Sequence, residues 1–438
     1  MKSVKYIIIA FLCVWVAACD SDEDSPVRDR SPFVMAVTPV QGLPEEVIRI
    51  QGRNFSSVRE NNEVMFNDKP AVVLEANAQE LQVVVPEGEG SADVRVRVAG
   101  QDAKGSVPVF SYLEFTDYVV ATLAGGESFG LEDGTGVAAL FRNPEGVAIS
   151  PDGDIIVADR TNHSIRRVTK DGVVTTIIGD GTFGFADGDV SVAKLNYPWK
   201  VDVDKNGNIF VVDNRNHAIR KIDTNGLVST IAGTGAAGFA DGPGAEAQFN
   251  APTDLVVADD GTIYVADNAN HKIRKITPEG EVSTLSGGAL GFGDGNLETA
   301  QFRNPSGIAI DKDGNLYVAD RLNHRIRKID LAAGKVSTIA GAGTTGSRDG
   351  IADEAQFNNP YGVEVDDEGV IYVADLNNNK IRMVEDGNVT TIAGSSTGFL
   401  DGAGVIAKFA SPTDVTVLDG IIYVADLGNH KVRKVYKK

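Results

Sequence analysis

Between residues 32 and 113, short apolar runs alternate with polar positions in the manner of β-strands. Val47 to Ile50, Leu81 to Val85 and Val94 to Val98 place every second side chain on one face, and turn residues such as Gly52 and Pro86 separate the runs. Period-2 runs at this spacing predict a β-sandwich of about 80 residues.

From residue 118 onward, a longer pattern recurs six times. An apolar-x-x-Pro segment ends at Pro144, Pro198, Pro252, Pro305, Pro360 and Pro412. A second landmark, which leads into an Ile/Val-Arg pair, begins at Asp159, Asp213, Asp267, Asp320, Asp375 and Asp426. Each unit contains four strand-like runs, which predicts a six-bladed β-propeller whose blades are stable only when stacked on one another.

The ends of the repeated region complement each other. The sixth unit stops at Lys438 after its third strand, whereas a surplus strand-like segment, Val119 to Gly125, precedes the first unit. We therefore expect residues 118–124 to form the outer strand of the last blade and to close a propeller that spans residues 118–438.

The first residues resemble a bacterial lipoprotein signal. Lys2 and Lys5 precede the apolar run Tyr6 to Val16, which is too short for a confident membrane span, and small residues lead to Cys19. We expect a signal peptide over residues 1–19 that ends in lipidation of Cys19. Ordinary signal cleavage next to an incidental cysteine is the alternative.

The segment after the signal, residues 20–31, is predicted to be an acidic linker. It resembles the signal that directs lipoproteins of Bacteroidetes to the outer face of the outer membrane, so we expect a lipid-anchored protein exposed at the cell surface. The chain has two cysteines, Cys13 and Cys19. The processed protein would therefore have no internal disulfide and no thiolate metal site.

Composition limits the partners. The chain is 42% hydrophobic, contains 48 glycines and carries a formal net charge of −20. These values indicate a folded β-protein rich in turns, with a surface that repels nucleic acid. We expect a monomer that contacts the membrane only through its lipid anchor and takes a glycan or a surface protein as its partner.

Two resemblances give the fold. Gly52-Arg53-Asn54-Phe55 and the closing Phe110-Ser111-Tyr112 make the first domain similar to immunoglobulin-like IPT/TIG domains. Asn143-Pro144-Glu145-Gly146 and Asn270-His271-Lys272-Ile273-Arg274 make the repeats similar to NHL repeats. The resemblance implies an all-β chain in which an IPT/TIG sandwich over residues 32–113 is followed by a six-bladed NHL-type propeller. Such propellers include scaffolds, nucleic-acid binders and a few lyases or hydrolases, so the fold leaves the function open.

The polar residues that recur in every blade are interpreted as structural. All five histidines occupy one slot of the repeat, which Asn379 fills in the fifth unit: His163, His217, His271, His324 and His430. Catalysis and metal binding need one asymmetric set of groups, so we expect turn caps that bond their own backbone. A ring of imidazoles around the axis is the alternative. The recurring aspartates, such as Asp159, are expected to pair with backbone or with the following arginine, here Arg166.

Two further motifs have the same explanation. Gly233 to Gly238 matches a dinucleotide fingerprint but recurs as a loop between blades. Asp202 to Gly207, with Asp213 at the twelfth position, echoes a calcium loop but contains the hairpin turn found in every blade. We therefore predict no cofactor, no metal site and no catalytic residue.

The positions that differ between units are the candidates for function. The residues directly after the repeated prolines are expected at the mouth of the central channel: Glu145, Trp199, Thr253, Ser306, Tyr361 and Thr413. Trp199 and Tyr361 could stack on a sugar ring, and Glu145 and Lys200 could bond it. Loop residues on the same face are Arg160, Arg215, Asn268 and Arg321. The alternative is that the two aromatic side chains only fill the gap between blades.

These observations favour a cell-surface lipoprotein that acts as a binding module, with glycan or nutrient capture through the propeller face. A propeller lyase or hydrolase is one alternative. A protein–protein scaffold is the other, and it would show a broad apolar patch in place of a pocket.

Overall fold

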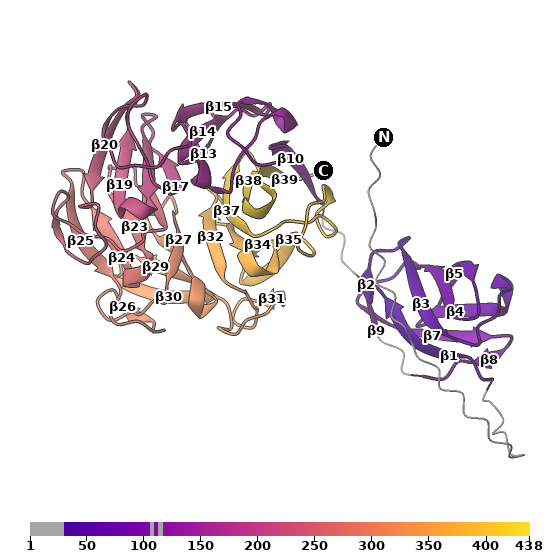
Figure 1. The fold of residues 1–438 in the computed structure, drawn as a ribbon. Coiled ribbons are helices and arrows are strands. Elements are labelled where there is room, and N and C mark those ends of the chain that lie inside the picture. Colours follow the sequence, from indigo (N-terminus) through magenta and orange to yellow (C-terminus); the bar gives the residue numbers. More distant parts are fainter. Residues whose placement is uncertain (1–29, 106–108, 113–116) are drawn as a thin grey trace, which may run out of the picture. The chain divides into compact units, whose positions relative to one another are not determined.

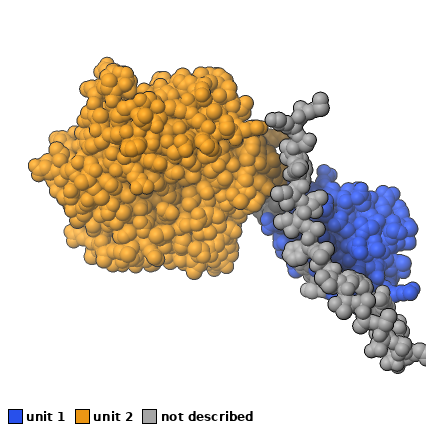
Figure 2. Space-filling model, viewed as in Figure 1, with its two compact units in different colours: residues 1–114 blue, residues 115–438 orange. Residues whose placement is uncertain are grey.

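The computed structural model describes residues 30–105, 109–112 and 117–438, which belong to two compact units, residues 1–114 and 115–438 (Figure 2). The predicted signal peptide, Cys19 and the linker up to residue 29 lie outside the described residues. No helix in the described parts of the chain has the length and apolar character needed to cross a membrane.

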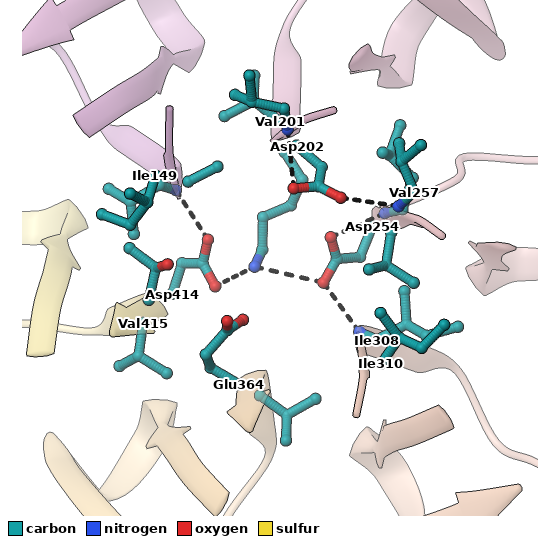
Figure 3. Close-up of a pocket in the computed structure, with 18 of the residues that line it drawn as sticks. Ile149, Val201, Asp202, Asp254, Val257, Ile308, Ile310, Glu364, Asp414 and Val415 are labelled. Atoms are coloured by element: carbon teal, nitrogen blue, oxygen red, sulfur yellow. Dashed lines mark hydrogen bonds and ion pairs between the residues drawn. The ribbon is translucent and has the colours of Figure 1, made fainter. Parts of the chain in front are cut away.

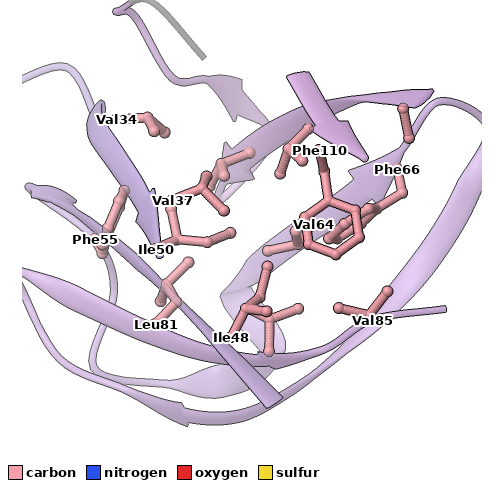
Figure 4. Close-up of a cluster of buried hydrophobic side chains, with 14 of the residues drawn as sticks. Val34, Val37, Ile48, Ile50, Phe55, Val64, Phe66, Leu81, Val85 and Phe110 are labelled. Carbon is pink, nitrogen blue, oxygen red and sulfur yellow. The ribbon is translucent and has the colours of Figure 1, made fainter. Parts of the chain in front are cut away.

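The nine strands of the first unit are linked in one sheet that curls around a common apolar core (Figure 1). Its strands are β1 (Phe33–Thr38), β2 (Gln41–Gly42), β3 (Val47–Arg53), β4 (Asn62–Phe66), β5 (Lys69–Ala76), β6 (Glu80–Val84), β7 (Ser91–Val98), β8 (Gln101–Asp102) and β9 (Val109–Tyr112). β3 alternates between exposed and buried positions along its whole length. The buried side chains, among them Ile48, Phe66 and Phe110, form one apolar core (Figure 4). The alternation in the sequence therefore predicts the buried face correctly.

The second unit contains six antiparallel sheets arranged as blades (Figure 1). The inner strands are β12 (Pro144–Ile149), β17 (Pro198–Val203), β22 (Asp254–Val257), β27 (Pro305–Ile310), β32 (Pro360–Val365) and β37 (Pro412–Leu418). The second strands are β13 (Ile155–Asp159), β18 (Ile209–Asp213), β23 (Ile263–Asp267), β28 (Leu316–Asp320), β33 (Ile371–Asp375) and β38 (Ile421–Asp426). The third strands are β14 (Ser164–Val168), β19 (Ala218–Ile222), β24 (Lys272–Ile276), β29 (Arg325–Asp330), β34 (Lys380–Glu385) and β39 (Lys431–Lys437). The fourth strands are β15 (Val173–Ile178), β20 (Leu227–Ala232), β25 (Glu281–Ser286), β30 (Lys335–Ala340), β35 (Asn388–Ala393) and, for the last blade, β10 (Tyr118–Ala124).

Neighbouring blades share their apolar cores. The second strand of each blade is buried over its whole length, or all but its first residue in the last blade, because both of its faces are covered. Ile156 and Ile165 of the first blade pack in one cluster with Leu195 and Val211 of the second. A single unit would leave these faces in water, so the propeller is stabilised by stacking.

The last blade combines the two ends of the propeller. β10 pairs antiparallel with β39, with Val120 opposite Val435. A hydrophobic cluster that contains Val120 also contains Val424 and Val435. This pairing joins the start of the propeller to its end.

Each blade has a fifth, two-residue strand at its outer edge, which we did not expect. These strands are β11 (Gly134–Thr135), β16 (Gly188–Asp189), β21 (Gly242–Pro243), β26 (Gly295–Asn296), β31 (Gly350–Ile351) and β36 (Gly402–Ala403). They come from the long loops between blades and pair with the fourth strands. The outer edge of each blade is thereby shortened and covered, which limits pairing with other chains.

Candidate functional site

The repeated aspartate and arginine form a buried clamp in the outer part of each blade. In the first blade, the Arg166 side chain is fully buried and donates to Asp159 Oδ2 at 2.9 Å and to Asp133 Oδ1 at 2.8 Å. Asp159 Oδ1 accepts the backbone N–H of Arg142 at 2.7 Å. The predicted pairing of the aspartate with backbone and with the following arginine is confirmed, and all six blades repeat it.

The histidine slot connects each blade to the next one. His217 lies in the left-handed conformation (φ 48°) at the end of the 3-10 turn η4 (Asn214–Asn216), and its Nδ1 accepts the backbone N–H of Ala251 at 3.0 Å. Asn379 in the fifth blade does the same through Oδ1, which accepts the N–H of Ser411 at 2.9 Å. The expected partner, the residue's own backbone, is therefore wrong: the left-handed turn points the side chain toward the following blade. Burial lowers the pKa of His217, which favours the neutral imidazole that can accept this bond.

The three aspartates of the motif that resembles a calcium loop lie in three different parts of the blade. Asp204 Oδ1 accepts the backbone N–H groups of Asn206 and Asn208 in the hairpin turn. Asp202 lines the central channel, and Asp213 belongs to the clamp of its blade. No group of three or more His, Cys, Asp or Glu side chains that could hold a metal ion occurs in the described part of the chain.

The inner strands bring unlike residues together around the axis. We call the positions one, two and four residues after the repeated proline the mouth level, the ion-pair level and the carboxylate level. At the ion-pair level the side chains are Lys200, Asp254 and Asp414, with glycines in the other three blades. At the carboxylate level, Asp202 and Glu364 stand among Ala148, Val256, Ala309 and Thr416.

A cavity of about 230 Å³ lies in the channel and is lined by positions two to five residues after the prolines. No residue of the mouth level is part of its lining. Since the inner strands run from the mouth level toward the hairpin turns, the cavity belongs to the hairpin end of the channel. Figure 3 shows Asp202, Asp254, Glu364 and Asp414 pointing toward the centre of this cavity from four different blades.

Lys200 is the cation of the cavity and is bound by two carboxylates. Its ammonium group contacts Asp414 Oδ1 closely and lies 3.3 Å from Asp254 Oδ2, with all three side chains at most 5% exposed. Burial alone would lower the pKa of Lys200, but the two carboxylates raise it above its ordinary value, so the lysine stays charged. Asp414 and Asp254 also accept backbone N–H groups of Val147 and Ile308, which stabilises their ionised form.

The two acidic residues of the carboxylate level differ in their bonding. Asp202 accepts the N–H of Val203 at 2.8 Å and that of Val257 at 2.7 Å. Burial nevertheless raises the pKa of Asp202 to about 6. Among the described residues, none donates a hydrogen bond or forms an ion pair with Glu364 (Figure 3). Burial and the nearby carboxylates, Asp202 first, raise the pKa of Glu364 well above its usual range.

The mouth level is filled by aromatic and charged side chains. Trp199 Nε1 donates to the Tyr361 hydroxyl at 2.5 Å, and because their blades are the second and the fifth of six, this bond spans the channel. The Arg160 guanidinium lies 5.1 Å from the Trp199 ring centroid and donates to Glu145 Oε2 at 2.7 Å. The Arg321 guanidinium lies 5.1 Å from the Tyr361 ring centroid. The structure thus brings five of the predicted site residues into one cluster.

The other predicted residues lie outside this cluster. Lys200 points into the cavity, Arg215 is exposed near the ring of Tyr197, and Asn268 is buried and donates to Pro305 O at 2.9 Å. Within the cluster, Tyr361 is buried and Trp199 is half-buried, so of the two rings Trp199 is the more accessible. A ligand role for each of these residues stays a prediction.

Sequence reasoning missed Asp254, Glu364 and Asp414. A signal was present in the sequence, because the inner strands should be apolar or contain glycine, as in Pro305-Ser306-Gly307-Ile308-Ala309-Ile310. A charged residue two or four positions after the proline breaks that pattern. Comparing the six inner strands position by position would have found these three residues together with Lys200 and Asp202.

Comparison with known proteins agrees with the two units. The family model described as IPT/TIG domain matches residues 32–112. The model described as NHL repeat matches residues 141–168, 195–222, 249–276, 302–329 and 409–435. The fifth blade lies outside these matched residues but has the same strands and the same clamp between Asp375 and Arg382.

Curated relatives share the repeats. The chain is 30% identical over 323 residues to NHL repeat-containing protein 2 of Bos taurus, which covers 64% of this chain and 44% of that protein. It is 29% identical over 275 residues to Protein SUPPRESSOR OF QUENCHING 1, chloroplastic, of Arabidopsis thaliana, which covers 58% of this chain and 26% of that protein. The chain thus spans less than half the length of these two relatives.

Solved structures resemble the chain over almost its whole length. An auxiliary nutrient binding protein from Bacteroides ovatus has 19% identity and a TM-score of 0.57, with 94% of this chain and 99% of that chain covered. A protein of unknown function from Bacteroides thetaiotaomicron has 21% identity and a TM-score of 0.57, with 93% and 98% covered. At this identity the likeness concerns the fold. The predicted fold class is confirmed: the chain is an all-β protein in which an N-terminal IPT/TIG immunoglobulin-like domain is followed by a six-bladed β-propeller with NHL repeats.

Proposed function

We propose that this protein is a binding module of the cell surface that captures a small nutrient molecule in the central channel of its propeller. One observation carries the proposal. The channel contains a cavity of about 230 Å³, and its charged side chains stand at positions where the residue type differs among the six repeats. Groups that every blade repeats hold the blades together, whereas an asymmetric set of polar groups in a concave site is what ligand recognition requires.

Two further observations support the proposal. A solved structure of the same fold from Bacteroides ovatus is named an auxiliary nutrient binding protein. The sequence before residue 20 resembles a lipoprotein signal, which would attach the protein to a membrane through Cys19. A lipid-anchored module with a small polar cavity would hold nutrients close to the cell.

The size of the cavity limits the ligand. Sites for drug-sized molecules usually measure about 300–1,000 Å³, so a cavity of about 230 Å³ suits a compound no larger than a single sugar ring. A longer glycan would place one unit in the cavity or would bind at the mouth level, where the ring of Trp199 remains partly accessible.

The test is calorimetric titration of the processed chain, residues 20–438, with monosaccharides, amino sugars, amino acids and short glycans. Three variants separate the two ends of the channel: Asp202→Asn alters the cavity, Trp199→Ala alters the mouth level, and Asp152→Asn is a matched control at an exposed hairpin turn. We expect Asp202→Asn to weaken binding by about tenfold or more, as loss of a charge-assisted hydrogen bond implies. The control should bind like the unaltered protein.

The fluorescence of Trp199 provides a second readout, because it is the one tryptophan of residues 20–438. A ligand in the cavity should leave its emission nearly unchanged, and a ligand at the mouth level should quench or shift it. Absence of binding to every compound of the panel would contradict the proposed function. Binding that Trp199→Ala abolishes and Asp202→Asn leaves intact would move the site to the mouth level.

The anchor is tested separately. We expect a Cys19→Ser variant expressed in a bacterial host that processes lipoproteins to lose incorporation of labelled palmitate and to be released from the membrane fraction. Retention of the label in that variant would exclude Cys19 as the lipidated residue.

A further inference from the structure

The cavity holds more acidic groups than its own cation can neutralise. Its lining contains one basic side chain, Lys200, and four carboxylates, Asp202, Asp254, Glu364 and Asp414. Lys200 binds Asp254 and Asp414. Asp202 and Glu364 form no ion pair with the described residues, and Lys200 acts on both carboxylates only from a longer distance.

Glu364 is the side chain of the cavity that most directly indicates a ligand. It stands on the inner strand β32 and points toward the centre of the channel (Figure 3). Its carboxylate receives no hydrogen bond from the described residues, whereas Asp202, Asp254 and Asp414 each accept two backbone N–H groups or one together with Lys200. The Glu364 side chain is half-buried and points into the cavity, so the donors that satisfy its carboxylate must come from water or from a ligand that enters the cavity.

The cavity already shows how it binds an ammonium group. The Lys200 Nζ lies between carboxylates from two other blades, Asp254 of the third and Asp414 of the sixth. Asp202 of the second blade and Glu364 of the fifth offer a similar pair on the carboxylate level. Asp202 is also the charged residue that acts most strongly on Glu364, so the two lie within electrostatic reach of each other.

A metal ion fits this arrangement less well. The described residues contain no cluster of three or more His, Cys, Asp or Glu side chains that could hold a metal ion. The ammonium of Lys200 in the same cavity would also repel a divalent cation. A primary ammonium carries a single charge and needs only acceptors, which Glu364 and Asp202 have free lone pairs to provide.

We infer that the cavity binds a small organic amine, with its protonated nitrogen held by Glu364 and Asp202. This inference rests on the proposed function and specifies its ligand class. The rest of the ligand would lie against the apolar part of the lining, which includes Val256, Ile310 and Val363.

The experiment compares three probes that share one pyranose ring on residues 20–438: D-glucosamine, D-glucose and the larger N-acetyl-D-glucosamine. Putrescine serves as an amine without a sugar ring and calcium chloride as a metal probe. By calorimetry at pH 7 we expect at least one amine to bind, and D-glucosamine to bind at least tenfold more tightly than D-glucose and N-acetyl-D-glucosamine. The Glu364→Gln variant keeps the shape and removes the charge, and it should weaken amine binding at least tenfold. Glu368→Gln, at an exposed position of the same blade, is the matched control and should change nothing.

Proton release gives an independent readout. A bound cation favours the ionised form of Glu364, so the carboxyl group should lose its proton when the amine binds. Titrations in buffers with different heats of ionisation should therefore show proton release, which Glu364→Gln removes. If that variant fails to fold, Asp202→Asn replaces it in the affinity measurement, where it should weaken amine binding at least tenfold.

The outcomes distinguish this inference from the proposed function. Equal affinity for D-glucose and D-glucosamine, or an amine preference that neither variant changes, would overturn the inference and leave nutrient binding in place. Tight calcium binding that displaces the amines and is lost in Glu364→Gln would overturn it in favour of a metal site. If none of these probes and no compound of the wider panel binds, both proposals fail.

Discussion

The outer clamps and the central channel both contain buried basic and acidic side chains, but these side chains are bonded differently in the two regions. In each clamp a fully buried arginine contacts one buried and one partly exposed aspartate, and backbone N–H groups or a threonine hydroxyl donate to the carboxylate oxygens left over. In the channel, one lysine faces four carboxylates, and one of these, Glu364, has no donor among the described residues.

The difference shows how repetition separates architecture from function in this fold. A residue that must hold each blade is kept six times, and its partners lie at fixed positions of the same repeat. A residue that recognises a ligand is needed once, so it replaces an apolar residue or a glycine in a single blade. In the first clamp each carboxylate oxygen of Asp159 has a donor, although the buried Nε atoms of Arg166, Arg220 and Arg274 have no acceptor, whereas the Glu364 carboxylate in the channel has no donor among the described residues.

The largest effect is expected from breaking a clamp. In an Arg166→Ala variant the Asp159 carboxylate stays fully buried without its cation, which should lower the free energy of unfolding by about 3–5 kcal/mol. Scanning calorimetry should show a lower unfolding temperature. The adjacent Arg167→Ala removes a side chain that is 44% exposed and 3.8 Å from Asp154, so it should cost less than about 1 kcal/mol. Equal unfolding temperatures for the two variants would show that the clamp does not stabilise the blade.

The connection between blades should have a smaller effect. His217→Ala leaves the backbone N–H of Ala251 without its acceptor and should cost about 1–3 kcal/mol. His217→Asn should retain most of the stability, because Asn379 accepts the equivalent bond in the fifth blade and asparagine tolerates the left-handed conformation.

The histidine bond also has a pH dependence with a defined sign. The folded-state pKa of His217 is lowered by burial, so its contribution to stability is present above the unfolded value of about 6.5 and is lost as the pH falls below it. The difference between the unaltered protein and His217→Ala should therefore shrink between pH 7 and pH 5, as measured by thermal unfolding. A difference that stays constant over this range would contradict the assignment of Nδ1 as an acceptor.

The sequence predicts the repeated part of the molecule well and the channel poorly, for a physical reason. The partners of Asp159 lie within one unit, and the recurrence of the Asp and Arg positions indicates their pairing. The partner of His217 lies 34 residues away in the next unit, so the expected cap on its own backbone is wrong and the sequence of a single unit does not identify the acceptor.

The charged groups of the channel come from four blades and meet only when the ring is closed. Nothing in the run Pro360-Tyr361-Gly362-Val363-Glu364 indicates that Glu364 faces Asp202 and Asp414. The mouth level was predicted from the residue after each proline, but the bond between Trp199 and Tyr361 depends on the opposite positions of the second and fifth blades.

Replacing the Glu364 carboxylate, which has no hydrogen-bond donor among the described residues, should stabilise the protein. The pKa of Glu364 is raised, so its contribution to stability is fully present below the unfolded value of about 4.3 and is lost as the pH rises through the folded value. Glu364→Gln should therefore match the unaltered protein near pH 4 and exceed its stability at pH 8 by about 1 kcal/mol, the low end of the range for an unsatisfied polar group, because Glu364 is only half-buried. Thermal unfolding at both pH values, with Glu368→Gln as the control, measures this difference. A variant that is less stable than the unaltered protein at pH 8 would mean that Glu364 has a structural partner.

The prediction with the smallest expected effect tests whether the residues of the mouth level stabilise the propeller, as the clamps do, or contribute to ligand binding, as we propose for the cavity. Tyr361→Phe removes the hydroxyl that accepts the Trp199 indole N–H and should cost about 0.5–1.5 kcal/mol. Tyr264→Phe is the control, because the hydroxyl of Tyr264 makes no side-chain hydrogen bond with the described residues. Loss of stability together with a shifted Trp199 emission and unchanged ligand affinity would place the aromatic pair with the clamps, as a structural closure of the channel. Unchanged stability with weakened binding would place the pair with the cavity, and the ligand would then reach both ends of the channel.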